Sequence, residues 1–268
     1  MNESAVPVTE AQCEAYRRDG AVLLPGLFAD WVETIAAGIE RNLREPGPYA
    51  AENLQPGEEG RFFDDYCNWT RIPEFVEVVR RSPAAAAAAA LMGSSRVQMF
   101  HDHVLIKEPG TAKPTPWHQD SPYYFVDGEQ TVSFWVPIDP VEAASLRLIA
   151  GSHRWEKPVL PVRWLAEDNF YAEADAFLPV PDPDGEPGRY RVLEWPMQPG
   201  DAVAFHFKAV HGARGNPGGR RRRAFSLRLL GDDARYVERP GRTSPPFPGH
   251  DMQAGQVLRE DWFPFLDR

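Results

Sequence analysis

Cysteine and long apolar runs are both scarce in this sequence. The two cysteines, Cys13 and Cys67, are too few for a disulfide-stapled secreted domain or a thiolate metal cluster. No run reaches the roughly 18 apolar residues that a membrane helix needs, and residues 1–12 lack the basic and apolar regions of a secretory signal. We therefore expect free thiols, no contact with a membrane and a cytoplasmic location.

Positive charge is in deficit as well. Lys and Arg number 29 against 39 Asp and Glu, which gives a net charge of −10. Because nucleic acids and anionic membranes attract basic surfaces, this balance argues against both as partners. The basic run at 220–223 does not alter this expectation, since it opens an alternating segment whose side chains face opposite sides. We expect one of these four arginines to point inward.

Glycine-rich nucleotide motifs are missing, because neither G-x-G-x-x-G nor a Walker sequence occurs. The 27 prolines, about a tenth of the chain, argue against a helical bundle. Short runs rich in β-branched and aromatic residues are present instead, with no helix alternating between them. They lie at 97–106, 131–138, 146–151, 189–195, 201–207 and 223–230. The sequence therefore predicts a β-sandwich or barrel core over 97–232.

Helical patterns come before this core. Capping signals and apolar spacing predict helices over 9–18, 30–44 and 73–92, with a short strand at 21–24. We expect this N-terminal part, 9–92, to pack on the β core, so that 1–268 forms a single domain.

A long segment without periodicity interrupts the core. Residues 156–188 show no strong pattern, and loops of this length inside a compact domain are usually functional. We interpret the segment as a lid that closes over a substrate together with Tyr123–Phe125. The aromatic side chains there favour a small organic molecule with apolar area as the substrate.

Two separated segments carry a pattern typical of a metal site. His118 and Asp120 fall on one face of an extended segment, because strand side chains alternate. His211 follows a turn and an apolar run far along the chain, and Arg222 stands eleven residues later. Two histidines and a carboxylate form the facial triad that holds Fe(II) and leaves positions for an organic cosubstrate and O₂. A planar guanidinium suits the carboxylate of such a cosubstrate.

Several stretches resemble the phytanoyl-CoA dioxygenase family, Fe(II)/2-oxoglutarate oxygenases built on a double-stranded β-helix. They are EAYRRDGAVLLPGLF, LIKEPGTAKPTPWHQD, SFWVPIDPVEAASLRLIAGSHRW and HGARGNPGGRRRRAFS. The sequence departs from the family at Ala150, where Pro is frequent, and at 143–145, where Asn-Gly is common. The resemblance implies a mainly β fold with flanking helices, a cupin-like jelly roll. It also implies Fe(II), with 2-oxoglutarate and O₂ as cosubstrates.

The resemblance extends to single residues. His118, Asp120 and His211 match the iron ligands, and Arg222 matches the residue that binds the distal carboxylate of 2-oxoglutarate. Positions expected to line the cosubstrate are Gln119, Trp135, Thr131 and His103. A core aromatic for Trp135 and a satisfied buried histidine for His103 or His101 stay open as alternatives. We interpret Lys107 as a surface charge or a charge at the substrate rim.

The expected activity is hydroxylation of an unactivated C–H bond in a small organic molecule, with decarboxylation of 2-oxoglutarate to succinate. Desaturation, cyclisation and epimerisation by the same iron chemistry stay open, and so does the oligomeric state. A metal-binding cupin-like protein without redox chemistry is another alternative, but it has no need for an inward arginine at 222. Related iron halogenases have Gly or Ala at position 120, so the carboxylate there argues against halogenation.

Overall fold

Two antiparallel sheets form the centre of this computed structural model, which describes residues 7–142, 146–165, 168–172 and 175–267. The long sheet has the order β1 (Ala21–Leu24), β10 (Ala202–Phe205), β7 (Thr131–Pro137), β12 (Arg222–Leu230), β4 (Gln98–Lys107), β3 (Phe62–Tyr66) and β2 (Ala51–Glu52). The short sheet has the order β5 (Thr115–His118), β11 (His211–Ala213), β8 (Leu146–Ile149) and β9 (Val192–Glu194). A third sheet pairs β6 (Val126–Asp127) with β13 (Arg235–Tyr236). The expected mainly β jelly roll is confirmed.

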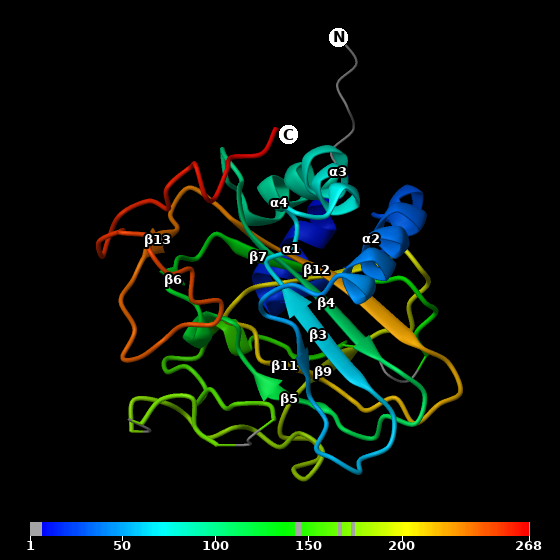
Figure 1. Ribbon diagram of the computed structural model, residues 1–268. Helices are drawn as coiled ribbons and strands as arrows, with labels where there is room; N and C mark the ends of the chain where they lie inside the picture. Colours follow the sequence, from blue (N-terminus) through cyan, green and yellow to red (C-terminus); the bar gives the residue numbers. More distant parts are fainter. Residues whose placement is uncertain (1–6, 143–145, 166–167, 173–174, 268) are drawn as a thin grey trace.

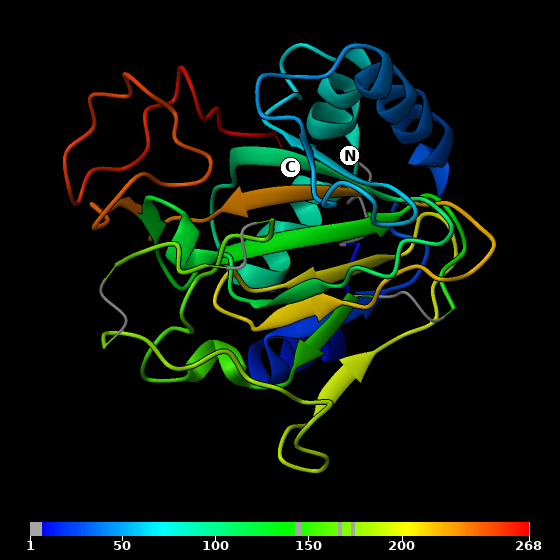
Figure 2. The ribbon, with the colours of Figure 1, turned by 60° about the horizontal axis from the view of Figure 1, so that its bottom comes forward.

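Helices cover the outer face of the long sheet. They are α1 (Glu10–Asp19), α2 (Val32–Arg44), α3 (Pro73–Arg81) and α4 (Ala84–Met92). Short 3₁₀ turns occur in the connections as η1 (Ala29–Trp31), η2 (Ser121–Tyr123) and η3 (Ser152–Arg154). Thr9 and Gln12 form a capping box at the start of α1, and Gly20 ends this helix with φ +76°. Figures 1 and 2 show α2, α3 and α4 together beside the long sheet. No helix in the described ranges is both long and apolar enough to cross a bilayer.

The single helix predicted over 73–92 is wrong, because the structure has two helices there. α3 ends at Arg81 and α4 begins at Ala84. Proline at 83 forces the preceding residue out of the helical region, and Ser82 accordingly has φ −71° and ψ 166°. The apolar pattern on both sides of this proline concealed the break.

The N-terminal part also contributes more than helices. Besides β1, which lies at the predicted strand, it supplies β2 and β3 to the far edge of the long sheet. Alternation between polar and apolar residues does not mark β3, because Phe62 to Asp65 are all buried. The β core is therefore assembled from both sides of the predicted boundary at 97.

The two faces of the long sheet differ in character. On β12, Phe225, Leu227 and Leu229 belong to the apolar cluster under the helices, and Phe225 packs 4.4 Å from the ring of Phe75 on α3. The residues between them face the space between the two sheets, where Arg222 and Arg228 are buried. The period of two in a strand thus separates a packing face from a polar face.

Candidate active site

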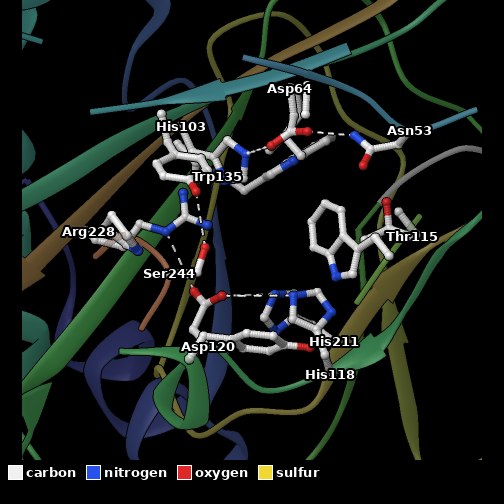
Figure 3. A pocket seen from close by; sticks show the side chains of 18 of the residues that line it. Asn53, Asp64, His103, Thr115, His118, Asp120, Trp135, His211, Arg228 and Ser244 are labelled. Carbon is white, nitrogen blue, oxygen red and sulfur yellow. Dashed lines mark hydrogen bonds and ion pairs between the residues drawn. The ribbon is translucent and has the colours of Figure 1, made fainter. Parts of the chain in front are cut away.

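Three side chains from two segments of the chain meet between the sheets. His118 ends β5, Asp120 follows two residues later, and His211 begins β11, which pairs with β5 directly opposite His118. Nε2 of His118 and Nε2 of His211 lie 3.8 Å and 3.7 Å from Oδ1 of Asp120. The ligand atoms of the three residues all lie within 4.8 Å of one another (Figure 3). This arrangement suits a single metal ion bound on one face.

The tautomers of both histidines are fixed by the backbone. Nδ1 of His118 donates to the carbonyl of Pro116 at 2.7 Å, and Nδ1 of His211 donates to the carbonyl of Ala209 at 2.9 Å. The proton therefore lies on Nδ1 in each ring, and the lone pair of Nε2 points towards Asp120. Backbone carbonyls commonly orient metal-binding histidines in this way.

Protonation states also fit a metal. Burial lowers the pKa of His118 to about 3, and nearby His211 adds to the effect. Burial lowers the pKa of His211 as well. Burial alone would raise the pKa of Asp120, but Arg228, followed by the two histidines, holds it well below its usual range. At neutral pH the site contains two neutral imidazoles and one carboxylate, the forms that bind a divalent cation.

The other carboxylate oxygen of Asp120 faces the long sheet. Ser133 Oγ donates a hydrogen bond to Oδ2 at 3.2 Å, and Nε of Arg228 lies 3.6 Å from the same oxygen. Arg228 also donates through Nε to the hydroxyl of Tyr124 at 3.1 Å. Asp120 is thus held so that Oδ1 alone faces the histidines. Sequence reasoning missed Arg228, although it shares a strand face with Arg222, six residues earlier.

The triad opens into a cavity of about 450 Å³. Arg222 lies on its wall, only 4% exposed, with its guanidinium carbon 5.9 Å from the ring centroid of Trp135. Burial lowers the pKa of Arg222 to about 10, so the side chain keeps its charge at neutral pH. The structure brings Arg222 and Trp135 to the same cavity as the triad.

Two of the expected residues lie elsewhere. The side chain of Gln119 points away from the cavity, where it donates to the carbonyl of Lys208 and accepts a hydrogen bond from the N–H of Val159. This orientation follows from its position between His118 and Asp120, since neighbouring side chains face opposite ways. Thr131 lies at the start of β7, beyond the cavity, and accepts from the N–H of Phe207 at 3.4 Å. Neither residue is among those that line the cavity, so the structure gives no support to a cosubstrate role for either, and that role stays an untested prediction.

His103 does line the cavity, and it has a partner. Its Nε2 lies 2.8 Å from Oδ2 of Asp64 on β3, and Asn53 donates to the other oxygen of Asp64 at 2.5 Å (Figure 3). Asp64 and Asn53 escaped sequence reasoning because β3 had not been recognised as a strand.

Lys107 is not a surface or rim charge. Its side chain is fully buried at the end of β4, where Nζ donates to the carbonyls of Lys113 and Arg214 at 2.8 Å and 3.3 Å. The ammonium also lies 4.3 Å from the ring centroid of Phe62. Burial, with a smaller effect from Arg222, lowers the pKa of Lys107 to about 6.

Part of the expected lid borders the cavity. Val162, Arg163, Trp164, Leu165 and Phe170 contribute to its wall, and the ring of Trp164 lies 5.2 Å from that of His118. The hydroxyl of Tyr123 donates to the carbonyl of Val162 and accepts from its N–H. Residues 166–167 and 173–174 of this segment lie outside the described residues. Closure of the segment over a substrate stays a prediction.

Comparison with known proteins defines the family. The sequence profile of phytanoyl-CoA dioxygenase (PhyH) matches residues 16–224, and the chain belongs to this family. A probable phytanoyl-CoA dioxygenase of Caenorhabditis elegans is 26% identical over 215 residues, which cover 76% of this chain and 62% of that protein. The chain therefore spans less than two thirds of the length of this relative.

Solved structures share the fold. The α-ketoglutarate-dependent carbocyclase SnoK from nogalamycin biosynthesis has a TM-score of 0.75 at 23% identity, covering 97% of both chains. EctD from S. alaskensis, solved with 2-oxoglutarate and 5-hydroxyectoine, has a TM-score of 0.70 at 19% identity, covering 95% of this chain and 86% of that one. At these identities the similarity establishes the jelly-roll fold.

Proposed function

We propose that the protein is an Fe(II)- and 2-oxoglutarate-dependent oxygenase that hydroxylates a C–H bond of a small organic molecule. One observation carries the proposal: the His118, Asp120 and His211 donor atoms converge in the same cavity as the buried guanidinium of Arg222. Fe(II) with 2-oxoglutarate supplies the oxidation, in which one atom of O₂ enters the substrate and the other enters succinate as CO₂ leaves. The family membership and the names of the structural relatives support this assignment.

The side chains of the cavity have separate tasks in this proposal. His118, Asp120 and His211 hold the metal through three donor atoms and leave the remaining coordination positions free. Arg222 binds the distal carboxylate of 2-oxoglutarate through a charge-assisted hydrogen-bond pair. Tyr123 and Trp164 close the wall next to His118 and exclude water from it.

Hydroxylation is proposed over the related reactions because it requires the fewest functional groups on the substrate. Insertion of oxygen needs only a C–H bond next to the metal, whereas cyclisation and epimerisation need further groups at defined positions. The names of the relatives include a carbocyclase and an epimerase, so the reaction outcome has to be measured directly.

Turnover under isotopically labelled O₂ tests the proposal. The protein is supplied with Fe(II), 2-oxoglutarate and a metabolite extract, and products are identified by mass. We expect labelled succinate and a product that gains one labelled oxygen. A product that loses two hydrogens would indicate desaturation or cyclisation, and an isomer of unchanged mass would indicate epimerisation. Absence of succinate, with metal bound, would favour a metal-binding protein without redox chemistry.

A further inference from the structure

The cavity wall contains a further cluster of polar side chains besides the metal triad and Arg222. It consists of His103 on β4, Asp64 on β3 and Asn53, which form a chain of hydrogen bonds. Asp64 and Asn53 are both 6% exposed, so the chain is built into the wall of the fold. Figure 3 shows the three side chains across the cavity from His118 and His211. Nothing in the proposed iron chemistry requires them.

The hydrogen bonds define the proton position on His103. Each oxygen of Asp64 accepts a hydrogen bond, one from Asn53 Nδ2 and one from His103 Nε2, so Asp64 is an ionised carboxylate and Nε2 carries a proton. The other nitrogen, Nδ1, forms no hydrogen bond with any residue that the structure describes. The His103 side chain keeps 11% of its surface exposed, on a residue that lines the cavity.

The hydrogen bond to Asp64 occupies Nε2, so Nδ1 is the nitrogen of His103 that is left for a ligand in the cavity. A ring that carries its proton on Nε2 alone presents a lone pair at Nδ1, which accepts a hydrogen bond. In this tautomer His103 offers the cavity an acceptor.

An acceptor does not suit 2-oxoglutarate. The carboxylates and the keto group of this cosubstrate have no hydrogen to donate, and the negative charge of Asp64 repels a dianion. A hydroxyl group donates a hydrogen bond without adding charge to a cavity that already has two buried arginines on its wall. The hydrogen-bonding chemistry thus favours a neutral hydroxyl, and not the cosubstrate, as the partner of His103.

The surroundings of His103 indicate where that hydroxyl lies. The ring of Trp164 stacks over His103 at 6.4 Å and meets His118 edge-on at 5.2 Å, so one aromatic side chain contacts both sites. Tyr66 packs edge-on against His103 at 5.4 Å, and Tyr49 stacks on Tyr66 at 5.0 Å. These aromatic walls suit a ring compound.

We propose that His103, oriented by Asp64 and Asn53, binds a hydroxyl group of a ring-containing substrate and sets its position relative to the metal. That the bound molecule is a substrate rests on the proposed function. The binding of a hydroxyl group at His103 does not depend on turnover. It replaces the expectation that His103 lines the cosubstrate.

Two probes that differ in a single donor test the proposal. Phenol and anisole share the aromatic ring, but only phenol has an O–H. Their dissociation constants are measured by ligand-observed NMR on the full-length protein, both metal-free and loaded with Zn(II) and 2-oxoglutarate. We expect phenol to bind about tenfold more tightly, the effect of one buried hydrogen bond, and His103→Phe to reduce this ratio to about one. Equal affinities for wild-type protein would overturn the proposal.

Asp64→Asn provides a sharper test, because it should reverse the polarity of His103. Asn53 donates to the Oδ1 position, so the new amide keeps its oxygen there and turns its NH₂ group towards Nε2. The imidazole proton then moves to Nδ1, which becomes a donor, and the phenol preference should disappear. Imidazole ¹⁵N shifts report the tautomer directly.

Asp65→Asn is the matched control. Asp65 is the next residue on β3 but faces the other side, where it accepts from Asn42 and from the N–H of Gly47. The phenol preference and the His103 tautomer should stay unchanged in this variant. If Asp64→Asn does not fold, the ¹⁵N shifts of wild-type protein decide the matter, since a proton on Nδ1 there would contradict the proposal.

The cosubstrate distinguishes failure of this site from failure of the proposed function. His103→Phe should bind 2-oxoglutarate, in the presence of metal, within about threefold of wild type. A loss beyond tenfold with an unchanged phenol preference would make His103 a cosubstrate residue and overturn the inference. Phenol preference in a protein that never converts 2-oxoglutarate would leave the hydroxyl site standing and refute the oxygenase.

Discussion

The two faces of the long sheet divide the work of this protein. On the outer face, β4 and β12 present Val104, Ile106, Phe225 and Leu227 to the helices, all fully buried and apolar. On the inner face, the same strands present His101, His103, Arg222 and Arg228 to the cavity. Consecutive residues therefore contribute either to packing or to the cavity. Substitutions on the outer face should affect stability, and substitutions on the inner face should affect ligand binding.

The comparison shows how differently the faces tolerate change. An apolar contact is not directional, so the outer face needs only volume and shape. Polar side chains of the inner face depend on particular partners, as Arg228 does on Asp120 and Tyr124. Loss of one partner there leaves a buried charge or hydrogen-bonding group unsatisfied. The following predictions test whether the two faces are independent.

The largest effect is expected at the metal triad. His211→Ala should abolish metal-dependent 2-oxoglutarate turnover, because two ligands no longer enclose the ion. Anaerobic titration with Fe(II) and 2-oxoglutarate, followed by visible absorption, measures the loss. The matched control is His206→Gln, which replaces a buried histidine hydrogen-bonded to the carbonyl of Glu129 and should retain the absorption band. Persistence of the band in His211→Ala would contradict the ligand assignment.

On the outer face, Phe225→Ala should reduce stability and leave the site intact. Phe225 is fully buried against Phe75, and removal of such a ring typically costs about 3–5 kcal/mol. Urea unfolding measures the loss, and calorimetry below the unfolding transition measures 2-oxoglutarate affinity. An affinity more than tenfold weaker in the folded protein would show that the faces are coupled.

Two consecutive arginines on β12, Arg222 and Arg223, allow the two faces of the sheet to be compared directly. Arg222→Met should weaken 2-oxoglutarate binding by about 2–4 kcal/mol, the usual cost of removing one partner of a buried charged pair. Arg223 instead faces outward, where it pairs with Asp139 and Glu40, so Arg223→Met should keep the affinity and lose at most about 1 kcal/mol of stability. The reverse result would assign the cosubstrate to Arg223.

The smallest effect is expected at Lys107, as a dependence of stability on pH. Its folded pKa of about 6 lies below the usual 10.5, so between these values the unfolded chain binds the additional proton. Stability should therefore rise with pH, by up to about 1.4 kcal/mol per unit. Lys107→Met removes this contribution. Urea unfolding of the metal-free proteins between about pH 7 and pH 9 measures the free energy of unfolding of each. It should rise more steeply with pH for the wild type than for Lys107→Met, and equal slopes would refute the prediction.

Much of the inner face was predictable wherever a strand was recognised. Alternation from Arg222 leads to Arg228, and the H-x-D spacing puts His118 and Asp120 on one side while it turns Gln119 to the other. The same rule turns Gln119 towards Lys208 and Val159, away from the position that the resemblance to the family implies. Thr131 lies on the same face of β7 as Trp135. It lies outside the cavity because β7 extends beyond the cavity wall at that end.

The sequence by itself determined a β core and the candidate triad, because these depend on local periodicity and on motifs within short segments, and its resemblance to the family implied the jelly roll. Tertiary structure alone decided that Asp64 and Asn53 reach His103, that Arg228 holds Asp120, and that Lys107 is buried. Each of these contacts joins segments that are far apart in the chain and meet only in the fold, as Asp120 after β5 of the short sheet meets Arg228 on β12 of the long sheet. Hydrogen bonding and burial depend on distance in space, and the pairing of β3 with β4, which brings Asp64 to His103, leaves no pattern within either strand.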